Sequence, residues 1–313
     1  MAQADYIEEL PLEEEAALRR ERGLWSDAFR RLIRNRLAVL GLIVLFAVFV
    51  VAVTGNYVDA VQRYEPKSQD YSVLHEGPSG SHFFGTDQLG RDNWSRVMQG
   101  TLISLEVGFG VQAFVLVLGL LVGGIAALGG RFLDNIMMRI TDIAYAFPDL
   151  LFIILLRSVF RQRDLPLVGT YTSDILLMMF AIGFVAWVTV ARLIRGQMLS
   201  LKERDFVIAA RAIGASPWRI VFQHMLPNTL GPVTVAVVFG IPLAIFAEAV
   251  LGFIGIGLQP PTASLGTLIS NGYHFIQTNI WLVTFPTAII AILMLCFTFV
   301  GDGLRDALDP HWR

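Results

Sequence analysis

The sequence is poor in charge, and it contains only one cysteine and two lysines. Charged residues make up 16% of its 313 residues, below the roughly 25% of an ordinary soluble domain. Hydrophobic residues make up 55%, and the mean hydropathy is +0.60. This composition indicates an integral membrane protein. The single cysteine, Cys296, excludes a disulfide framework, and the five histidines show no metal-ligand spacing, so no metal site is predicted.

The scarcity of lysine excludes an ATP-binding phosphate loop. Such a loop has the pattern G-x-x-x-x-G-K-[ST], in which lysine directly follows glycine. Lys67 follows a proline and Lys202 follows a leucine, so neither fits. We therefore expect no cofactor on this chain. A membrane-embedded enzyme would need a cluster such as Ser/His/Asp at a common depth. None is evident, and the chain is predicted not to be an enzyme.

Apolar runs predict six membrane-spanning helices, because each span needs about 20 mostly apolar residues. Five runs are evident, at 37–55, 102–128, 175–191, 229–254 and 280–300. A sixth, at 136–156, contains Arg139, Asp142 and Asp149. It is included because an even number of spans places both termini on one side of the membrane. The predicted fold class is an all-α polytopic membrane protein.

The distribution of Lys and Arg predicts the orientation of these spans. Segments 1–36, 129–141, 192–228 and 301–313 together hold 17 of the 24 Lys and Arg residues, and the other side holds seven. By the positive-inside rule, both termini are cytoplasmic. Three arginines, at positions 157, 161 and 163, run against this trend in a short outer loop.

The chain divides into parts around a five-span core at 101–300. An N-terminal segment (1–36) and a first span (37–55) precede an extracytoplasmic segment (56–100), and a cytoplasmic tail (301–313) ends the chain. In the first part, Trp25, Phe29, Leu32 and Ile33 recur at helical spacing among arginines. This pattern predicts an amphipathic helix on the inner membrane surface. A helical extension of the first span is the alternative.

The longest cytoplasmic loop, 192–228, contains the stretch DFVIAARAIGASPWRIVFQHMLP (205–227), which predicts two short helices. Gly214 ends the first helix because glycine readily adopts the left-handed conformation. Ser216 followed by Pro217 is a cap followed by a favoured first helical residue. The second helix is predicted to run from Pro217 to Leu226. Pro227 is then expected to bend the chain into the next span.

The first of these helices carries an apolar stripe. On a helical wheel, Ala209, Ala210 and Ile213 lie within about 60° of Phe206. The two alanines leave room for close approach by a partner. Amphipathic stripes are common, however, so this spacing leaves open that the loop packs only against its own bundle.

The sequence AARAIGA…HMLPN in this loop resembles the cytoplasmic loop motif of ABC-importer permeases. In that motif, Glu-Ala-Ala, three residues and Gly precede an Ile-x-Leu-Pro-like close. More widely, the chain resembles the C-type permease subunit of oligopeptide and dipeptide importers, in the peptide/nickel transporter family. The supporting segments, which cover most of residues 82–310 in the family's order, are HFFGTDQLGRDNWSRV (82–97), RITDIAYAFPDLL (139–151), ARLIRGQMLSLKERDFV (191–207), EAVLGFIGIGLQPPTASLGTLI (248–269) and GDGLRDALDP (301–310).

The chain departs from this motif at one position. Ile208 stands where the family usually has the glutamate of the Glu-Ala-Ala triplet. The wheel places it about 200° from Phe206, on the side of the arginines. Ile208 either packs back against the membrane domain or meets an apolar patch on a partner. The motif carries over to Ala209, Ala210 and Gly214.

The resemblance implies a type I ABC importer permease fold with a cytoplasmic coupling helix, in the bacterial inner membrane. The implied partners are a homologous second permease subunit, two ATP-binding subunits that hold ATP and Mg, and an extracytoplasmic substrate-binding protein. Nucleic acid is not an expected partner. Closure of the ATPase pair would move the coupling helix and switch the bundle between inward- and outward-facing states. The implied coupling residues are Phe206, Ile208, Ala209, Ala210, Ile213, Gly214, Ser216 and Pro217.

Ionisable residues inside spans are candidates for the translocation path or a gate, because such residues are costly in lipid. Glu248 in the fifth span is the first candidate, and Asp142 and Asp149 in the third are the others. Because Arg139 and Asp142 are three residues apart, they are expected to pair locally. A purely structural role is therefore favoured for the third span.

Two other interpretations remain open from the sequence. The same machinery could import nickel or another small solute, because these importers have similar permeases. An ion-coupled secondary transporter would favour inverted halves with coupling charges at the midplane. No such repeat is evident, and the cytoplasmic insert would then lack a purpose.

Overall fold

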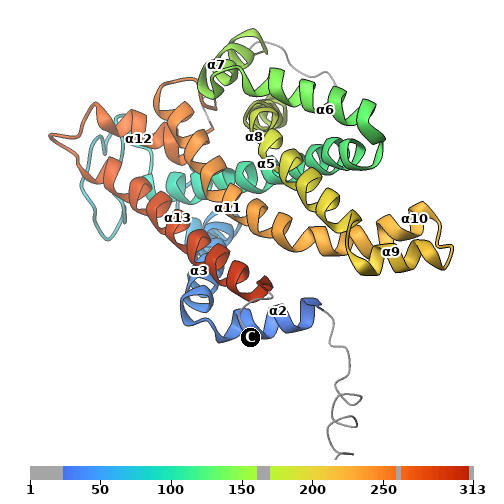
Figure 1. Ribbon diagram of the computed structural model, residues 1–313. Helices are drawn as coiled ribbons and strands as arrows, with labels where there is room; N and C mark the ends of the chain where they lie inside the picture. Colours follow the sequence, from blue (N-terminus) through green and yellow to red (C-terminus); the bar gives the residue numbers. More distant parts are fainter. Residues whose placement is uncertain (1–23, 161–169, 259–261, 310–313) are drawn as a thin grey trace, which may run out of the picture.

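The computed structural model describes residues 24–160, 170–258 and 262–309, and within these ranges the chain is helical without a β-strand. Figure 1 shows the long helices packed side by side, with α9 (Asp205–Ala212) and α10 (Pro217–Ile220) projecting at one end and α12 (Leu265–Tyr273) lying at the other. We refer to these as the α9 end and the α12 end. Residues 1–23 of the predicted N-terminal segment, Arg161 and Arg163 lie outside the described residues.

Five helices among the described residues are long and apolar enough to span a membrane. They are α3 (Arg36–Tyr57), α5 (Asn93–Leu128), α8 (Thr170–Lys202), α11 (Leu226–Phe253) and α13 (Trp281–Leu308). Each contains one predicted apolar run, complete or lacking a single terminal residue. Helix α5 begins nine residues before its predicted start at 102, because Asp92 caps it by accepting a hydrogen bond from the Ser95 amide over 2.9 Å. Helix α8 continues to Lys202, so the loop predicted from 192 begins after that residue.

The segment predicted as a sixth span, 136–156, is two helices. Helix α6 (Gly130–Tyr145) and helix α7 (Asp149–Phe160) are separated at residues 146–148. The prediction of one continuous helix here was wrong because Pro148 cannot donate a backbone hydrogen bond and disfavours helical geometry at Phe147. The break places Asp149 in the first turn of α7.

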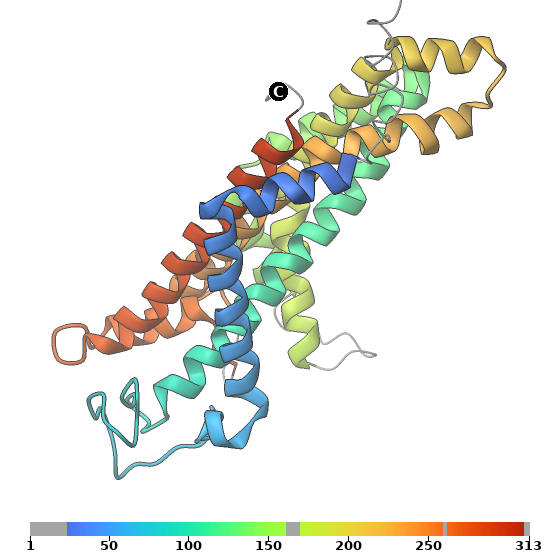
Figure 2. The ribbon, with the colours of Figure 1, turned by 90° about the horizontal axis from the view of Figure 1, so that it is seen from below.

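Helix α2 (Leu24–Arg34) is separate from the first span. The Asn35 side chain caps α3 by accepting hydrogen bonds from the amides of Leu37 and Ala38, and the chain turns sharply between α2 and α3 (Figure 2). The alternative of a helical extension is therefore wrong. Helix α2 lies against the end of α13, where Arg31 donates to the Asp309 carbonyl over 3.3 Å. The far side of α2, including Phe29, is exposed.

Helices α5 and α8 pack closely along most of their length. A Cβ atom at Gly119 would lie 2.8 Å from the Val190 side chain, and one at Gly123 would lie 2.4 Å from the Ala191 carbonyl. Small residues that allow such close approach are typical of helix pairs in membranes, where dispersion rather than the hydrophobic effect favours association. This α5–α8 pair forms the centre of the core, which includes Val111, Met178 and Ile194.

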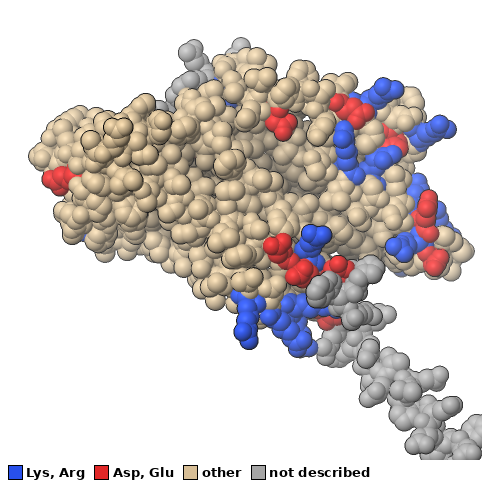
Figure 3. Space-filling model, turned by 60° about the vertical axis from the view of Figure 1, so that its left-hand side comes forward, with Lys and Arg blue, Asp and Glu red and all other residues tan. Residues whose placement is uncertain are grey.

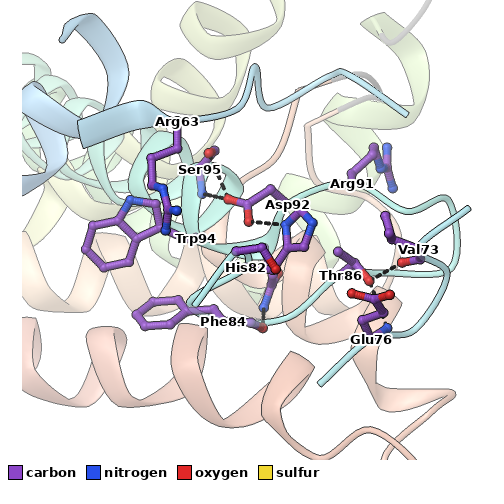
Figure 4. Close-up of polar contacts among 12 residues, drawn as sticks. Arg63, Val73, Glu76, His82, Phe84, Thr86, Arg91, Asp92, Trp94 and Ser95 are labelled. Atoms are coloured by element: carbon purple, nitrogen blue, oxygen red, sulfur yellow. Dashed lines mark hydrogen bonds and ion pairs between the residues drawn. The ribbon is translucent and has the colours of Figure 1, made fainter. Parts of the chain in front are cut away.

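The segment between α3 and α5 is folded against the α12 end by its own polar contacts (Figure 4). Buried His82 contacts the Asp92 carboxylate through Nδ1 over 2.9 Å, so one carboxylate both caps α5 and holds the preceding loop. Asp87 pairs with Arg91 over 2.8 Å and with Arg96. The predicted extracytoplasmic segment is therefore an ordered part of the fold.

We expect Asp92→Ala to destabilise the protein. The substitution removes a helix cap worth about 1 kcal/mol, and it leaves buried His82 without its acceptor at a further cost of about 1–3 kcal/mol. Asp70→Ala is the matched control, because exposed Asp70 bonds only locally, to Ser72. Thermal unfolding in detergent measures both. Equal shifts of the midpoint for the two variants would contradict this role of Asp92.

Candidate functional site: the α9–α10 tip and a membrane groove

The stretch 205–227 begins as the sequence predicts, with a helix, a glycine turn and a capped second helix. Helix α9 runs Asp205–Ala212, and Gly214 follows with a φ of +81°. Ser216 Oγ then accepts a hydrogen bond from the Arg219 amide, and Pro217 occupies the first turn of α10 (Pro217–Ile220). A left-handed conformation at Gly214 reverses the chain between the two helices.

The second helix does not end at Leu226 as predicted. Helix α10 continues through a π-helical turn (Val221–Met225) into α11, and together they form one helical run, Pro217–Phe253. The helix continues through Pro227 because the wider π turn directly before it accommodates a residue that lacks an N–H. No loop therefore separates α10 from α11.

The predicted apolar stripe on α9 is divided between a packed face and a free face. Val207 and Ala210 are buried against the bundle, whereas Phe206, Ala209 and Ile213 are exposed. The prediction that Ala210 shares a partner-facing stripe was wrong. The reason is tertiary: α9 packs on α8 and α10, and Val207 and Ala210 join the apolar core there.

Ile208 lies on the free face of α9 and is 53% exposed, so it does not pack back against the membrane domain. Helix α10 and the π turn after it add exposed aromatic rings, because Trp218 is 72% exposed and stacks on Phe222 with 5.7 Å between ring centroids. Large exposed apolar side chains that gather in this way mark an interaction surface. We call this surface the coupling tip; its members are Phe206, Ile208, Ala209, Ile213, Trp218 and Phe222.

Two ion pairs join α6 to the half of α8 that leads to the coupling tip. Asp142 accepts a hydrogen bond from Arg192 over 2.8 Å, and Asp134 accepts two from Arg195, one of them over 2.7 Å. The hydrogen bonds from Arg195 hold the pKa of the Asp134 carboxyl below its usual value. The expectation of a local ion pair between Arg139 and Asp142 was wrong, because the Asp142 carboxylate pairs with Arg192 of α8.

A groove of about 430 Å³ lies between α5, α7, α8 and α11, and its walls are mostly apolar. Its polar side chains are Gln112, Asp149 and Thr189. Of the three ionisable residues predicted for a path or gate, Asp149 lines this groove, whereas Asp142 and Glu248 do not. The break at Pro148 places Asp149 there, because it begins α7 at the side of the groove.

Glu248 is fully buried between helices instead of lining an open space. Ser104 of α5 donates a hydrogen bond to its Oε2 atom over 2.9 Å. One turn further on, Gly252 lies so close to α12 (Leu265–Tyr273) that a Cβ atom would come 2.9 Å from the Thr267 amide. This contact leaves little freedom to bend at Gly252. Glu248 thus joins α5 to the C-terminal part of α11.

In the sequence, Arg157 stands out only because it runs against the predicted distribution of Lys and Arg. The structure explains this position. The Arg157 side chain is fully buried and donates to the Asp174 carboxylate over 2.7 Å and to the Gly257 carbonyl over 2.8 Å. It thereby joins α7, α8 and the loop after α11. A charge that is neutralised inside the protein does not act on membrane orientation as a free loop charge does.

We expect Arg157→Met to destabilise the protein strongly. It removes the charged partner of the Asp174 carboxylate and one donor from each of three backbone carbonyls, those of Asp174, Ile256 and Gly257, and breaking a buried pair costs about 3–5 kcal/mol. Arg192→Met is the control, because its pair with Asp142 is exposed and worth about 1 kcal/mol or less. The measurement is thermal unfolding in detergent. A loss for Arg157→Met no larger than the control's would show that the Arg157 contacts are dispensable.

Comparison with known proteins agrees with this architecture. Residues 116–313 match the family "Binding-protein-dependent transport system inner membrane component", and residues 23–78 match the N-terminal transmembrane domain of oligopeptide transport permease C. The oligopeptide transport system permease protein OppC of Escherichia coli (strain K12) is 40% identical over 296 residues, which cover 93% of each chain. The dipeptide transport system permease protein DppC of Bacillus subtilis (strain 168) is 38% identical over 92% of this chain and 86% of its own.

Solved structures share the fold at lower identity. An inward-facing structure of the MetNI methionine ABC transporter matches 68% of this chain and 96% of its own, with a TM-score of 0.55 and 22% identity. An amino acid ABC transporter structure matches 67% and 93%, with a TM-score of 0.52 and 14% identity. Taken with the sequence relatives, these matches establish that the chain belongs to the family of binding-protein-dependent transport system inner membrane components, as a C-type permease subunit.

Proposed function

We propose that this chain is the C-type permease subunit of an ATP-driven importer of oligopeptides or dipeptides in the bacterial inner membrane. The observation that carries this proposal is the coupling tip, which exposes apolar side chains and continues without a break into α11. A tip of this kind fits a groove on a separate ATP-binding subunit. The sequence relatives that carry the words oligopeptide and dipeptide in their names support the choice of cargo.

The partners follow from this assignment. Two ATP-binding subunits would hold ATP and Mg, a homologous second permease would complete the membrane core, and an extracytoplasmic binding protein would deliver the cargo. Ile208 supports an apolar contact with one ATP-binding subunit, because it lies on the free face of α9. Both termini are cytoplasmic in this arrangement, on the same side as the coupling tip, and the segment 63–92 lies outside.

The arrangement of charges supports this orientation. Basic and acidic side chains gather towards one end of the molecule, and much of the remaining surface carries few of them (Figure 3). Helix α2, with Arg30, Arg31 and Arg34, lies against the final turns of α13. Since basic residues favour the cytoplasmic side, this end is assigned to the cytoplasm.

ATP binding would change which conformation of the permease the ATP-binding subunits bind more tightly. When ATP closes the ATPase pair, the pair binds one position of the coupling tip more tightly than the other, and this difference shifts the permease between inward- and outward-facing states. The continuous run Pro217–Phe253 carries the displacement into the core. The groove with Asp149 is the proposed place where cargo contacts this subunit. Nickel or another small solute is the alternative cargo.

We expect Gly214→Pro to abolish ATP-dependent uptake of a labelled tri- to pentapeptide into vesicles that contain the complete transporter. Proline fixes φ near −65°, whereas Gly214 has a φ of +81°. Gly214→Asn is the control, because asparagine tolerates the left-handed conformation and a Cβ atom here meets no atom within 4 Å. Peptide uptake without ATP-binding subunits would overturn the proposed function, and ATP hydrolysis without peptide uptake would change the cargo.

We expect Asp149→Asn to slow the ATP-dependent uptake of a lysine-containing tripeptide about fivefold relative to a glutamate-containing one, since a partly exposed charge contact is worth about 1 kcal/mol. Asp142→Asn makes the same chemical change seven residues earlier, outside the groove. Uptake of the two labelled peptides is measured in the same vesicles. An equal effect of both variants would argue against the groove as the cargo path.

A further inference from the structure

Helix α2 presents three faces, of which one packs on the described part of the chain and two are exposed. On the packed face, Ala28 is buried, and Leu32 lies against α13, where a Cβ atom at Gly303 would come 3.2 Å from its side chain. Phe29 and Ile33 form a second face and are 64% and 53% exposed. Residues four apart are neighbours on a helix surface. These two side chains therefore make one continuous apolar face.

The third face of α2 is basic and carries a pair of like charges. Arg30 and Arg34 are both exposed and four residues apart, so they are neighbours on the helix and repel each other. Among the described residues neither forms a salt bridge, although Asp27 lies only one turn before Arg30. This face therefore offers positive charge that no salt bridge within the described chain compensates.

The position of α2 is fixed by its two neighbouring helices. It directly precedes the span α3, and the chain turns sharply between them, so α2 runs across the end of the bundle (Figure 2). Contact with α13 holds it there, because Arg31 donates to the Asp309 carbonyl over 3.3 Å. Leu37 and Leu40, in the first turns of α3, are also exposed. The exposed apolar side chains of α2 therefore continue into those of a membrane span.

An anionic phospholipid is the complement of both exposed faces. A helix with one apolar and one basic face lies in the membrane interface, where its apolar side chains reach the boundary with the acyl chains. Arginine matches a phosphate group because its planar guanidinium donates parallel hydrogen bonds. Clustered arginines next to a span attract anionic lipids, and Arg36 adds a third exposed one. A soluble acidic protein would match Arg30 and Arg34 but not Phe29 and Ile33.

We propose that α2 binds the phosphate group of an anionic phospholipid between Arg30 and Arg34, with an acyl chain of the same lipid against Phe29 and Ile33. The two faces are about 100° apart, because each arginine directly follows one of the apolar residues. The bound anion relieves the repulsion within the arginine pair and holds α2 in the interface. The leaflet, which is the cytoplasmic one, rests on the proposed function, whereas the binding itself does not.

Binding of fluorescently labelled phosphatidylglycerol and phosphatidylcholine to the complete transporter in detergent tests this site. We expect the wild type to bind phosphatidylglycerol at least about tenfold more tightly than phosphatidylcholine. Arg30→Gln/Arg34→Gln is expected to weaken phosphatidylglycerol binding about thirtyfold and to leave phosphatidylcholine binding unchanged, since it removes two basic residues at the membrane surface. Arg30→Lys/Arg34→Lys keeps both charges, so it should stay within about fivefold of the wild type.

Helix α6 provides a matched control. Arg131 and Arg139 are also exposed and form no salt bridge among the described residues. They are eight residues apart, or about 12 Å along the helix, so they cannot share one phosphate group. Arg131→Gln/Arg139→Gln is therefore expected to bind phosphatidylglycerol like the wild type. Equal losses in the two glutamine variants, or equal affinity of the wild type for both lipids, would overturn the proposal.

A photocrosslinking probe distinguishes a lipid from other occupants of this face. Benzoylphenylalanine replaces Ile33 in membranes that contain the complete transporter, and we expect adducts with lipid. A product with an ATP-binding subunit or another protein would contradict the proposal, as would displacement of the labelled lipid by inorganic phosphate. Selective binding of phosphatidylglycerol by a transporter that shows no ATP-dependent peptide uptake would support this site and count against the proposed function.

Discussion

The close approach of α5 and α8 is the constraint on which the rest of the bundle depends. Gly119 and Gly123 let the two helices come together until backbone and side chain touch, with no space for a Cβ atom. Since this contact fixes the centre, the other elements take positions around it. Helices α3 and α11 also pack on α5, while α6 and α7 pack on α8. The groove that contains Asp149 borders this pair, and the coupling tip follows directly after α8 in the chain.

Charged residues in this chain fall into two groups that the structure separates clearly. Arg157 is buried with Asp174, and Asp142 and Asp134 are joined to arginines of α8, so these charges hold helices to one another. Asp149 instead lines a groove, and no salt bridge holds it within the part of the chain that the structure describes. In a membrane protein, a charge without an internal partner is the more informative kind, because its cost must be met by cargo, water or a partner.

Local features of the fold could be predicted from the sequence, whereas features that join distant segments could not. Gly214, Ser216 and Pro217 act through their own backbone preferences, so the turn and the cap were predictable. Pro148 carried a similar signal, which the apolar run around it obscured. In contrast, Asp142 pairs with Arg192, which is 50 positions away. Which face of α9 is buried depends on its contacts with α8 and α10. Helical spacing alone gives no information on either point.

The π turn has a consequence for the direction in which the coupling tip points. Successive residues of an α-helix are rotated by about 100°, because each turn contains 3.6 residues. The turn at Val221–Met225 pairs residues five apart instead of four, so it changes the rotational phase between α10 and α11. The direction in which Trp218 and Phe222 point around the axis of α11 therefore depends on the number of residues in this short segment.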